Sequence, residues 1–441
     1  MPLVLYDSYT QKTRPVDETK LITIYDCGPT VYNDVHIGNV RPMITFDVLV
    51  KYLRYKQDQV RYVQNLTDID DKIINKAKQE NKTESQISEF YSEQYIKLMA
   101  QLNAIKPDVM PKVSENIDDI IDFVDQLVKK NKAYVADDGD VYFSIDSVRD
   151  TYGKLSKQNL DELIDGVRKT NKKNKANSLD FVLWKKTDTG LNWKSPWNDH
   201  GRPGWHTECV LFVNKYLDKS ITIHGGGIDL IFPHHENENA QNEALNGCGL
   251  ADFWMHTGHI NVDGIKMSKS LNNFILAKDI LKKYSSNVIR WYMFQTTYRN
   301  PLNFSQVLID QAKENLEKLM RSINTAIINL KLNNIKLKRS KVVSQEFIKA
   351  MDRDLNFPNA VTVIIEQVKT FSILFRNKDF TSINSTIDSI FTEFDVLGIK
   401  YELKFSKEDL KIIANWKKAI KRNDYTITDS CRKYFIDKKI I

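Results

Sequence analysis

The sequence predicts an α/β protein in which a doubly wound parallel sheet carries an insertion and is followed by an α-helical bundle and a small C-terminal region. Three observations support this fold class. A strand–helix–strand pattern occupies residues 21–68, the same alternation returns over 206–260, and helical periodicity dominates from about residue 280 onward. The chain has 441 residues, more than one hydrophobic core usually supports, so we expect several domains.

The first strand–helix–strand unit is the clearest of these patterns. LITIYDCG (21–28) has the β-branched and aromatic residues of a buried strand and ends at a glycine. The next segment has apolar residues at helical spacing: Val40, Ile44, Val48, Tyr52 and Tyr55. QVRYVQNLTD (59–68) then predicts a second strand. This order is the building block of Rossmann-like sheets, which bind nucleotides.

A long segment separates this unit from the second half of the sheet. Residues 72–132 are predicted to be helical and charged, and AYVADDGDVYFSI (133–145) alternates like two strands around an Asp-Gly turn. The second half of the sheet is predicted from a helix at 206–217, a strand at 220–227, a helix at 234–245 and a strand at 252–260. Long helices are predicted over 305–335, 344–372 and 406–422.

These patterns divide the chain into five segments. We expect the first half of a Rossmann-like catalytic domain at 1–104, a connective insertion at 105–200, the second half of the catalytic domain at 201–300, a helical bundle at 301–400 and a short C-terminal region at 401–441.

The composition is that of a soluble globular protein and excludes several classes. Hydrophobic residues make up 41% and charged residues 27%. No apolar run is long enough to span a membrane, and the N-terminal segment lacks the pattern of a secretion signal. Four cysteines in a chain of this size do not form a disulfide framework. We therefore expect a cytoplasmic protein whose functional cysteines are metal ligands or nucleophiles.

Charge and histidine are distributed unevenly along the chain. Residues 1–300 carry 39 Lys and Arg against 40 Asp and Glu, a balance of −1, which leaves 64 − 39 = 25 against 57 − 40 = 17, or +8, for residues 301–441. All eight histidines lie between His36 and His259. The basic tail indicates an anionic macromolecule such as nucleic acid, although a solvated Lys-rich surface has the same composition. The histidines indicate that the chemistry lies before residue 260.

The first candidate site lies between the first strand and its helix. There, Asp34-Val35-His36-Ile37-Gly38-Asn39 occupies the position at which a nucleotide phosphate rests on the amides of a helix N-terminus. His36 can donate a hydrogen bond to a phosphate as charge develops, and Gly38 permits close approach of the backbone. On its own this motif is not specific.

The second candidate site is a lysine loop, Lys266-Met267-Ser268-Lys269-Ser270, after a predicted strand and turn. Two lysines three residues apart suit a loop that closes on a triphosphate, and are also typical of an exposed basic loop. The two motifs together, in this order and about 230 residues apart, resemble the two signatures of class I aminoacyl-tRNA synthetases.

A candidate metal site combines residues that are distant in sequence. Cys27 ends the first strand, Cys209 lies in GWHTEC (204–209), and His234 and Glu238 are four residues apart on one face of a predicted helix. Two thiolates, an imidazole and a carboxylate are suitable zinc ligands. Spacing alone also allows one buried cysteine and an exposed acidic helix.

A longer series of motifs resembles cysteinyl-tRNA synthetases of the bacterial type. The motifs occur in collinear order over residues 3–310: CGPTVY (27–32), HIGN (36–39), NLTDIDDKII (65–74), YGKLS (152–156), GRPGWH (201–206), HGGGID (224–229) and FPHHENE (232–238). The resemblance continues at MDRDLN (351–356) and weakly over 410–436. Two positions depart from the family pattern: Asn39 replaces a frequent histidine, and Asn272 replaces a frequent glycine.

The resemblance implies a role for each candidate residue. It assigns His36 and Asn39 to the α-phosphate of ATP, and Lys266 and Lys269 to the leaving pyrophosphate. The adenosine and amino-acid site is implied at Gly38, Gly225, Gly226, Gly227 and Asp229, with Thr67 and Trp205 near the cysteine. It also implies one Zn²⁺ per chain, held by Cys27, Cys209, His234 and Glu238.

The same resemblance implies an enzyme that uses ATP with Mg²⁺ to join L-cysteine to tRNA(Cys), without a separate editing domain. We expect a monomer with no membrane partner and with tRNA contacts in residues 301–441. A fragment that ends near Phe304 is expected to activate cysteine if it folds, because the candidate residues precede it. Two alternatives stay open: a ligase that joins cysteine to an amino-sugar thiol precursor on the same core, and a non-catalytic RNA- or zinc-binding relative.

Overall fold

The computed structural model describes residues 2–159, 175–267 and 273–441. Its centre is a four-stranded parallel sheet in the order β10-β9-β3-β4. The strands are β3 (Ile22–Asp26), β4 (Val60–Gln64), β9 (Ile221–Gly227) and β10 (Ala251–Thr257). Each was predicted within a few residues of these bounds, and the parallel α/β fold is confirmed.

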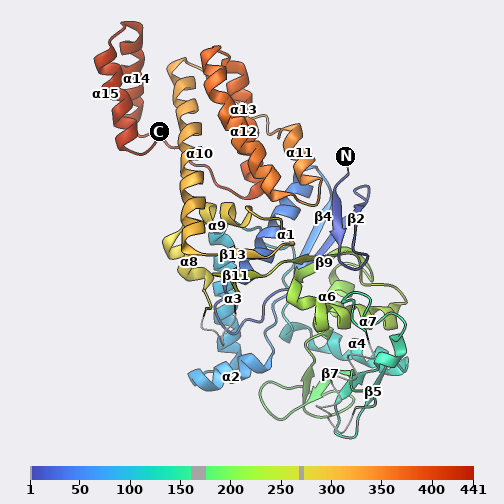
Figure 1. Cartoon of the computed structure of the whole chain (residues 1–441). Helices are drawn as coiled ribbons and strands as arrows, with labels where there is room; N and C mark the ends of the chain where they lie inside the picture. The colour runs from blue at the N-terminus through green and yellow to red at the C-terminus, as the bar shows by residue number, and fades with distance from the viewer. Residues whose placement is uncertain (1, 160–174, 268–272) are drawn as a thin grey trace.

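Helices cover both faces of this sheet, as a doubly wound fold requires (Figure 1). Ile24 and Phe253 pack into the core that includes α1 (Ile37–Tyr55), whereas Tyr25 and Trp254, their neighbours in the chain, pack into a second core on the opposite face. The helices of the second core are α4 (Ile117–Lys129), α6 (Thr207–Tyr216) and α7 (Glu236–Asn246).

The order of the strands creates a crevice at one edge of the sheet. β3 and β9 are adjacent, but the chain continues from β3 to its neighbour β4 and from β9 to β10, in opposite directions. Loops leaving two such strands separate at their carboxyl ends, which is where ligands bind in open α/β sheets. The segments that follow β3 and β9 contain seven of the fifteen candidate residues: Cys27, His36, Gly38, Asn39, Asp229, His234 and Glu238.

Smaller elements surround the central sheet. An antiparallel sheet contains β5 (Ala133–Val135), β6 (Val141–Phe143), β7 (Phe181–Lys186) and β8 (Gly201–Pro203). The helices α2 (Asp71–Glu80) and α3 (Glu84–Gln101) follow β4. Two short sheets join β1 (Val4–Asp7) to β2 (Lys12–Pro15), and β11 (Ile260–Val262) to β12 (Ile265–Lys266) and β13 (Leu302–Phe304).

The C-terminal part of the chain is helical, as predicted. Its helices are α8 (Ala277–Lys283), α9 (Ser286–Met293), α10 (Gln306–Leu332), α11 (Gln345–Met351), α12 (Phe357–Arg376), α13 (Phe380–Leu397), α14 (Lys407–Lys421) and α15 (Tyr425–Asp437). The prediction of one helix over 344–372 is wrong. Asp354 and Leu355 lie between α11 and α12 and have φ values of 57° and 48°. These left-handed conformations interrupt the predicted helix.

The break between α11 and α12 has a structural cause. The Asp354 carboxylate accepts hydrogen bonds from the Tyr6 backbone N–H at 2.9 Å and the Tyr298 hydroxyl at 2.6 Å. Asp352 accepts one from the Tyr52 hydroxyl of α1 at 2.7 Å. These bonds attach the chain between α11 and α12 to β1, to α1 and to the segment after α9, and a continuous helix would not present both carboxylates in this way.

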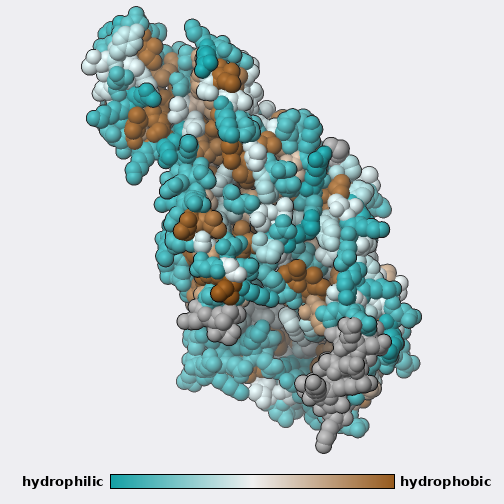
Figure 2. Space-filling view, viewed as in Figure 1, coloured by the Kyte–Doolittle hydropathy of each residue, from teal (hydrophilic) through white to brown (hydrophobic). Residues whose placement is uncertain are grey.

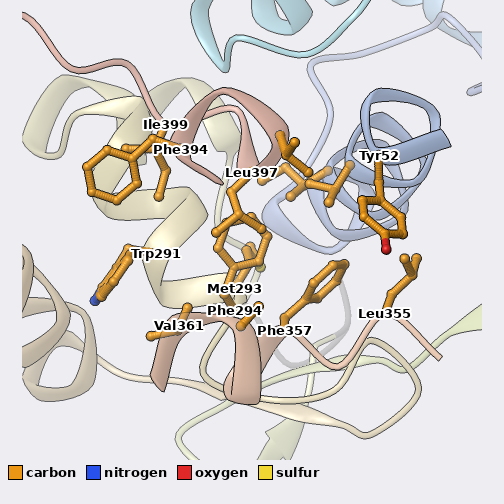
Figure 3. Packing of buried hydrophobic residues seen from close by; sticks show 14 of the residues in the cluster. Tyr52, Trp291, Met293, Phe294, Leu355, Phe357, Val361, Phe394, Leu397 and Ile399 are labelled. Carbon is orange, nitrogen blue, oxygen red and sulfur yellow. The ribbon is translucent and has the colours of Figure 1, made fainter. Parts of the chain in front are cut away.

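The bundle and the sheet share one hydrophobic core. Side chains from α1, α9, α12 and α13 meet there (Figure 3), including Tyr52, Phe294, Phe357 and Leu397. A fragment ending near Phe304 would lose much of this core, so the structure argues against its folding. In contrast, α14 and α15 form a separate small cluster with the far end of α10 (Figure 1). Among the described residues, no helix is long and apolar enough to cross a membrane.

Candidate active site

A cavity of about 450 Å³ opens at the carboxyl ends of β3 and β9. Most of the residues predicted from the sequence line it: Cys27, His36, Gly38, Asn39, Thr67, Trp205, Cys209, Gly227, Asp229, His234 and Lys266. These residues come from separate parts of the chain, so the fold brings the His36 motif, Lys266 at the start of the lysine loop and three of the four candidate metal ligands to one place.

Three of the predicted residues that the structure describes do not line this cavity. Gly225 and Gly226 are buried within β9, where a Cβ on Gly225 would lie 1.9 Å from the Met255 carbonyl oxygen of β10. Close packing of two strands therefore requires a glycine there. Glu238 is fully buried behind Cys27 and His234. Lys269 lies outside the described residues, as does Asn272.

Cys27, Cys209, His234 and Glu238 converge, with their ligand atoms within 4.8 Å of one another. The two sulfurs are 3.7 Å apart, and His234 Nε2 is 3.6 Å from each of them. A tetrahedral zinc ion with the usual bond lengths separates two sulfurs by about 3.8 Å and a sulfur from a nitrogen by about 3.6 Å. The three distances measured between ligand atoms match these values, so the donor set fits a zinc ion.

The distance between the ligand atoms of His234 and Glu238 is shorter than a zinc site requires. His234 Nε2 and Glu238 Oε1 are 2.7 Å apart, a hydrogen-bond distance. Burial opposes ionisation of Glu238, but the imidazoles of His234 and His224 outweigh it and hold the pKa of this carboxyl well below its usual range. A small separation of the two side chains would complete the tetrahedron.

Neighbouring side chains fix the orientation of these donors. His206 Nδ1 lies 3.0 Å from His234 Nδ1, and His224 Nε2 lies 2.5 Å from Glu238 Oε2. Burial, together with His234, lowers the pKa of His206 to about 3, so it is neutral and can accept a hydrogen bond. Such partners hold a metal-binding imidazole in one tautomer. The indole of Trp205 stacks on His234, with ring centroids 4.4 Å apart.

A second group of possible metal donors overlaps the first. It combines Cys27 and Glu238 with His224 and His235. Neither of these two histidines lines the cavity, and His235 Nδ1 is 2.8 Å from His256 Nε2. The first group has three members on the cavity wall, so it is the group that a substrate can reach.

Sequence reasoning missed several polar side chains of the cavity floor. Glu208 is buried beside Thr67, whose hydroxyl donates to Glu208 Oε1 at 2.7 Å. Burial raises the pKa of the Asp26 carboxyl to about 8, and Gln64 Nε2 donates to this carboxyl at 2.6 Å. The Tyr95 hydroxyl of α3 donates in turn to Gln64 Oε1 at 2.9 Å. Glu208 and Asp26 each precede a candidate cysteine, and this adjacency was an available signal.

The segment that contains His36 is tied to the chain after the lysine loop. The Ile37 N–H donates to the Ile275 carbonyl at 2.9 Å, and the Ala277 N–H donates to the Val35 carbonyl at 3.0 Å. His36 is the N-cap of α1 and packs edge-on against Phe274, with ring centroids 4.7 Å apart. The His36 segment therefore adjoins the chain at 274–277, and Lys266 and Phe274 line the same cavity as His36.

Gly38 and Asn39 occupy the first turn of α1. A Cβ on Gly38 would lie 2.7 Å from the His36 ring, so any larger residue would displace the imidazole. Asn39 Oδ1 accepts a hydrogen bond from the His36 N–H at 3.3 Å. Asn39 thus also caps the helix, a role for which an amide side chain is suitable.

Comparisons with known proteins agree with this geometry. Residues 13–314 match the family described as tRNA synthetases class I (C) catalytic domain. The cysteine–tRNA ligase of Ureaplasma parvum serovar 3 is 42% identical over 99% of this chain and 100% of its own length, and that of Malacoplasma penetrans has the same identity and coverage. The chain belongs to the cysteine–tRNA ligase family. The resemblance found in the motifs is therefore confirmed.

Solved structures of more distant synthetases share the fold of this family member. Methionyl-tRNA synthetase of Mycobacterium tuberculosis, in complex with methionyl-adenylate, superposes with a TM-score of 0.64 over 93% of each chain, at 11% identity. At this identity the likeness concerns the fold alone. It agrees with the Rossmann-like sheet and helical tail described above.

Proposed function

We propose that the chain is an ATP-dependent ligase that joins L-cysteine to the 3′ end of tRNA(Cys). The observation that carries this proposal is the meeting, in one cavity, of a Cys₂-His-Glu cluster with the helix N-terminus at His36. The cluster suits a thiol and the helix N-terminus suits a phosphate. Relatives named cysteine–tRNA ligase, matched over their full length, support the same activity.

The reaction would have two steps. A carboxylate oxygen of cysteine attacks the α-phosphorus of ATP, the bond to the bridging oxygen breaks, and pyrophosphate leaves with the electron pair. A hydroxyl of the terminal adenosine of tRNA then attacks the carbonyl carbon of cysteinyl-adenylate and releases AMP. The protein would act by positioning these groups and by stabilising charge on phosphorus.

The candidate side chains each have a place in this scheme. His36 and Asn39, at the start of α1, would donate hydrogen bonds to the α-phosphate. Lys266, on the cavity wall, and Lys269 would attract the leaving pyrophosphate with its Mg²⁺. Asp229, exposed two residues after β9, would accept hydrogen bonds from the adenosine or from the amino group of cysteine.

Zinc would be held by Cys27, Cys209, His234 and Glu238. When bound, zinc supplies a Lewis-acid contact for the substrate thiolate, which a serine hydroxyl makes far less well. A site built to bond one substrate group rejects an analogue that lacks it by about 10⁴- to 10⁵-fold. Trp205, which stacks on His234, and Thr67 would shape the remainder of the amino-acid pocket.

The tail would supply the tRNA contacts. The proposal assigns the tRNA body to residues 301–400 and the anticodon to 401–441, with 105–200 as a connective insertion and with a monomer acting in the cytoplasm. The amino-sugar alternative does not require such a tail, and the named ligases match this chain over 99% of its length. Intact cavity residues argue against a non-catalytic relative.

Amino-acid-dependent exchange of pyrophosphate into ATP tests the first step. Cysteine should support exchange, and serine should support it at least about 10⁴-fold less efficiently. Exchange with another amino acid, or none with cysteine, would contradict the proposed function.

A further inference from the structure

The connection between α10 and α11 is an irregular segment attached along α13. Residues 335–344, here called the strap, contain no helix or strand. The side-chain amide of Asn384, in α13, makes two hydrogen bonds to the strap backbone, one on each side of Leu337. Its Oδ1 accepts from the Lys338 N–H at 3.0 Å, and its Nδ2 donates to the Lys336 carbonyl oxygen at 2.7 Å. The backbone of the strap is therefore fixed to the helix.

Two carboxylates farther along α13 continue this attachment. Asp388 accepts from the Ser340 N–H at 2.7 Å, and Glu393 accepts from the Ser344 N–H at 3.0 Å. From the first attachment to the second, the strap advances by two residues while α13 advances by four. Four helical residues rise about 6 Å, close to the length of two extended residues. Residues 336–340 are thus held extended along α13, toward the end of this helix that packs on α1, and the left-handed φ of 58° at Lys341 ends the extended part.

The acidic groups of α13 are occupied by the strap backbone and by one arginine. Asp388 and Glu393 are 2% and 0% exposed, and buried carboxylates are tolerated only when hydrogen-bonded or paired. Arg339 pairs with Asp388 at 3.3 Å and with Asp395 at 3.1 Å. The strap lysines take no part in these pairs.

Lys336, Lys338 and Lys341 are exposed on the outer side of this segment. Throughout the described part of the chain, no carboxylate forms an ion pair with any of the three. They belong to the region that holds the +8 charge excess (25 basic against 17 acidic residues), and hydrophilic side chains cover most of the visible face of the bundle (Figure 2). The bonds to Asn384 and Asp388 hold the backbone beside these three lysines, so three exposed positive charges stay close together within six residues.

We propose that the strap is a binding surface for the phosphate backbone of a nucleic acid, with Lys336, Lys338 and Lys341 as its contacts. Under the proposed function, on which this inference rests, the nucleic acid is the tRNA. Each phosphate neutralised releases counterions, which contributes about 0.7 to 0.9 log units of affinity per decade of salt. Three contacts therefore contribute a slope of about 2 to 3, or about 100- to 1000-fold in affinity between 1 M and 0.1 M salt.

The test is a triple variant, Lys336→Gln, Lys338→Gln and Lys341→Gln, in the full chain. Binding of tRNA is measured by fluorescence anisotropy at several salt concentrations, together with cysteine-dependent pyrophosphate exchange without tRNA. We expect the salt slope of tRNA binding to fall by about 2 to 3, with exchange unchanged. The corresponding triple Lys→Arg variant should restore most of the slope, because it restores the charge.

The matched control removes three exposed lysines from the catalytic part, with Lys12→Gln, Lys20→Gln and Lys219→Gln. Lys20 and Lys219 precede β3 and β9, at the edge of the sheet opposite the cavity. The control should leave the slope nearly unchanged. An unchanged slope in the strap variant, or an equal loss in the control, would overturn the proposal. Absence of exchange in the unmodified chain would instead refute the proposed function, since tRNA binding is measured independently.

Discussion

Truncation at two positions should give opposite results because the tail contains two separate cores. A chain ending at Lys404 lacks α14 and α15, whose apolar side chains cluster with Ile328 and Leu332 of α10. Exposing these two side chains removes about 3 to 6 kcal/mol of hydrophobic stabilisation, at about 1.5 to 3 kcal/mol for each side chain. The loss is local, because this end of α10 lies far from the sheet (Figure 1). We expect this chain to fold.

A chain ending at Phe304 loses the partners of buried groups in the catalytic part. Arg290 Nε donates to the Leu397 carbonyl at 2.8 Å, and the hydroxyls of Tyr52 and Tyr298 donate to carboxylates of the tail. An unpaired buried polar group costs about 1 to 3 kcal/mol, so three cost about 3 to 9 kcal/mol. The apolar surface of α1 and α9 is exposed in addition. Because domains are stable by only about 5 to 15 kcal/mol, this chain should not fold.

Thermal unfolding monitored by circular dichroism, combined with the two activity assays, distinguishes these cases. The chain ending at Lys404 should unfold cooperatively and retain pyrophosphate exchange while transferring cysteine to tRNA poorly. The chain ending at Phe304 should show no cooperative transition. A cooperative transition with full exchange in the shorter chain would refute the shared core. Undiminished transfer of cysteine to tRNA by the chain ending at Lys404 would refute a tRNA contact in α14 and α15.

Three substitutions test individual roles in the cavity. Cys209→Ser should lower the bound zinc from about one per chain, measured by atomic absorption, and raise the KM for cysteine far more than that for ATP; full zinc content would contradict the assigned ligands. Thr67→Val removes the donor to buried Glu208 and should destabilise the protein by about 1 to 3 kcal/mol in urea unfolding, whereas Thr67→Ser should not. Lys269→Ala should slow adenylate formation in single-turnover experiments with cysteine affinity nearly intact; a loss confined to cysteine affinity would disprove its role.

The sequence was sufficient to predict the strands of the central sheet, because the patterns that indicate a strand lie within a few neighbouring residues. LITIYDCG and SITIHGGG are short apolar runs that end at glycines, and β3 and β9 lie within them. The break in the predicted helix over 344–372 was not foreseen, because it depends on bonds from Asp352 and Asp354 to distant parts of the chain. Helical periodicity does not register such contacts.

The candidate site was predictable in its members but not in its surroundings. Motifs identified Cys209 and His234, but only the fold shows their approach to Cys27 at hydrogen-bonding distances. Tyr95, in a helix without a recognised motif, lines the cavity and donates a hydrogen bond to Gln64 there. The strap could not be predicted from the sequence either. A lysine-rich connection has the composition of any solvated loop, and only the structure shows that its backbone is hydrogen-bonded to α13.

Formation of cysteinyl-tRNA is the most direct test of the account. The purified chain, incubated with radiolabelled cysteine, ATP, Mg²⁺ and tRNA(Cys), should transfer the label to acid-precipitable RNA in an alkali-labile bond. Labelled serine at the same concentration should give no detectable product. In a parallel reaction that also contains an amino-sugar thiol precursor, transfer of the label to this acceptor and none to RNA would contradict the proposed ligase activity, as would no transfer from a chain that carries zinc.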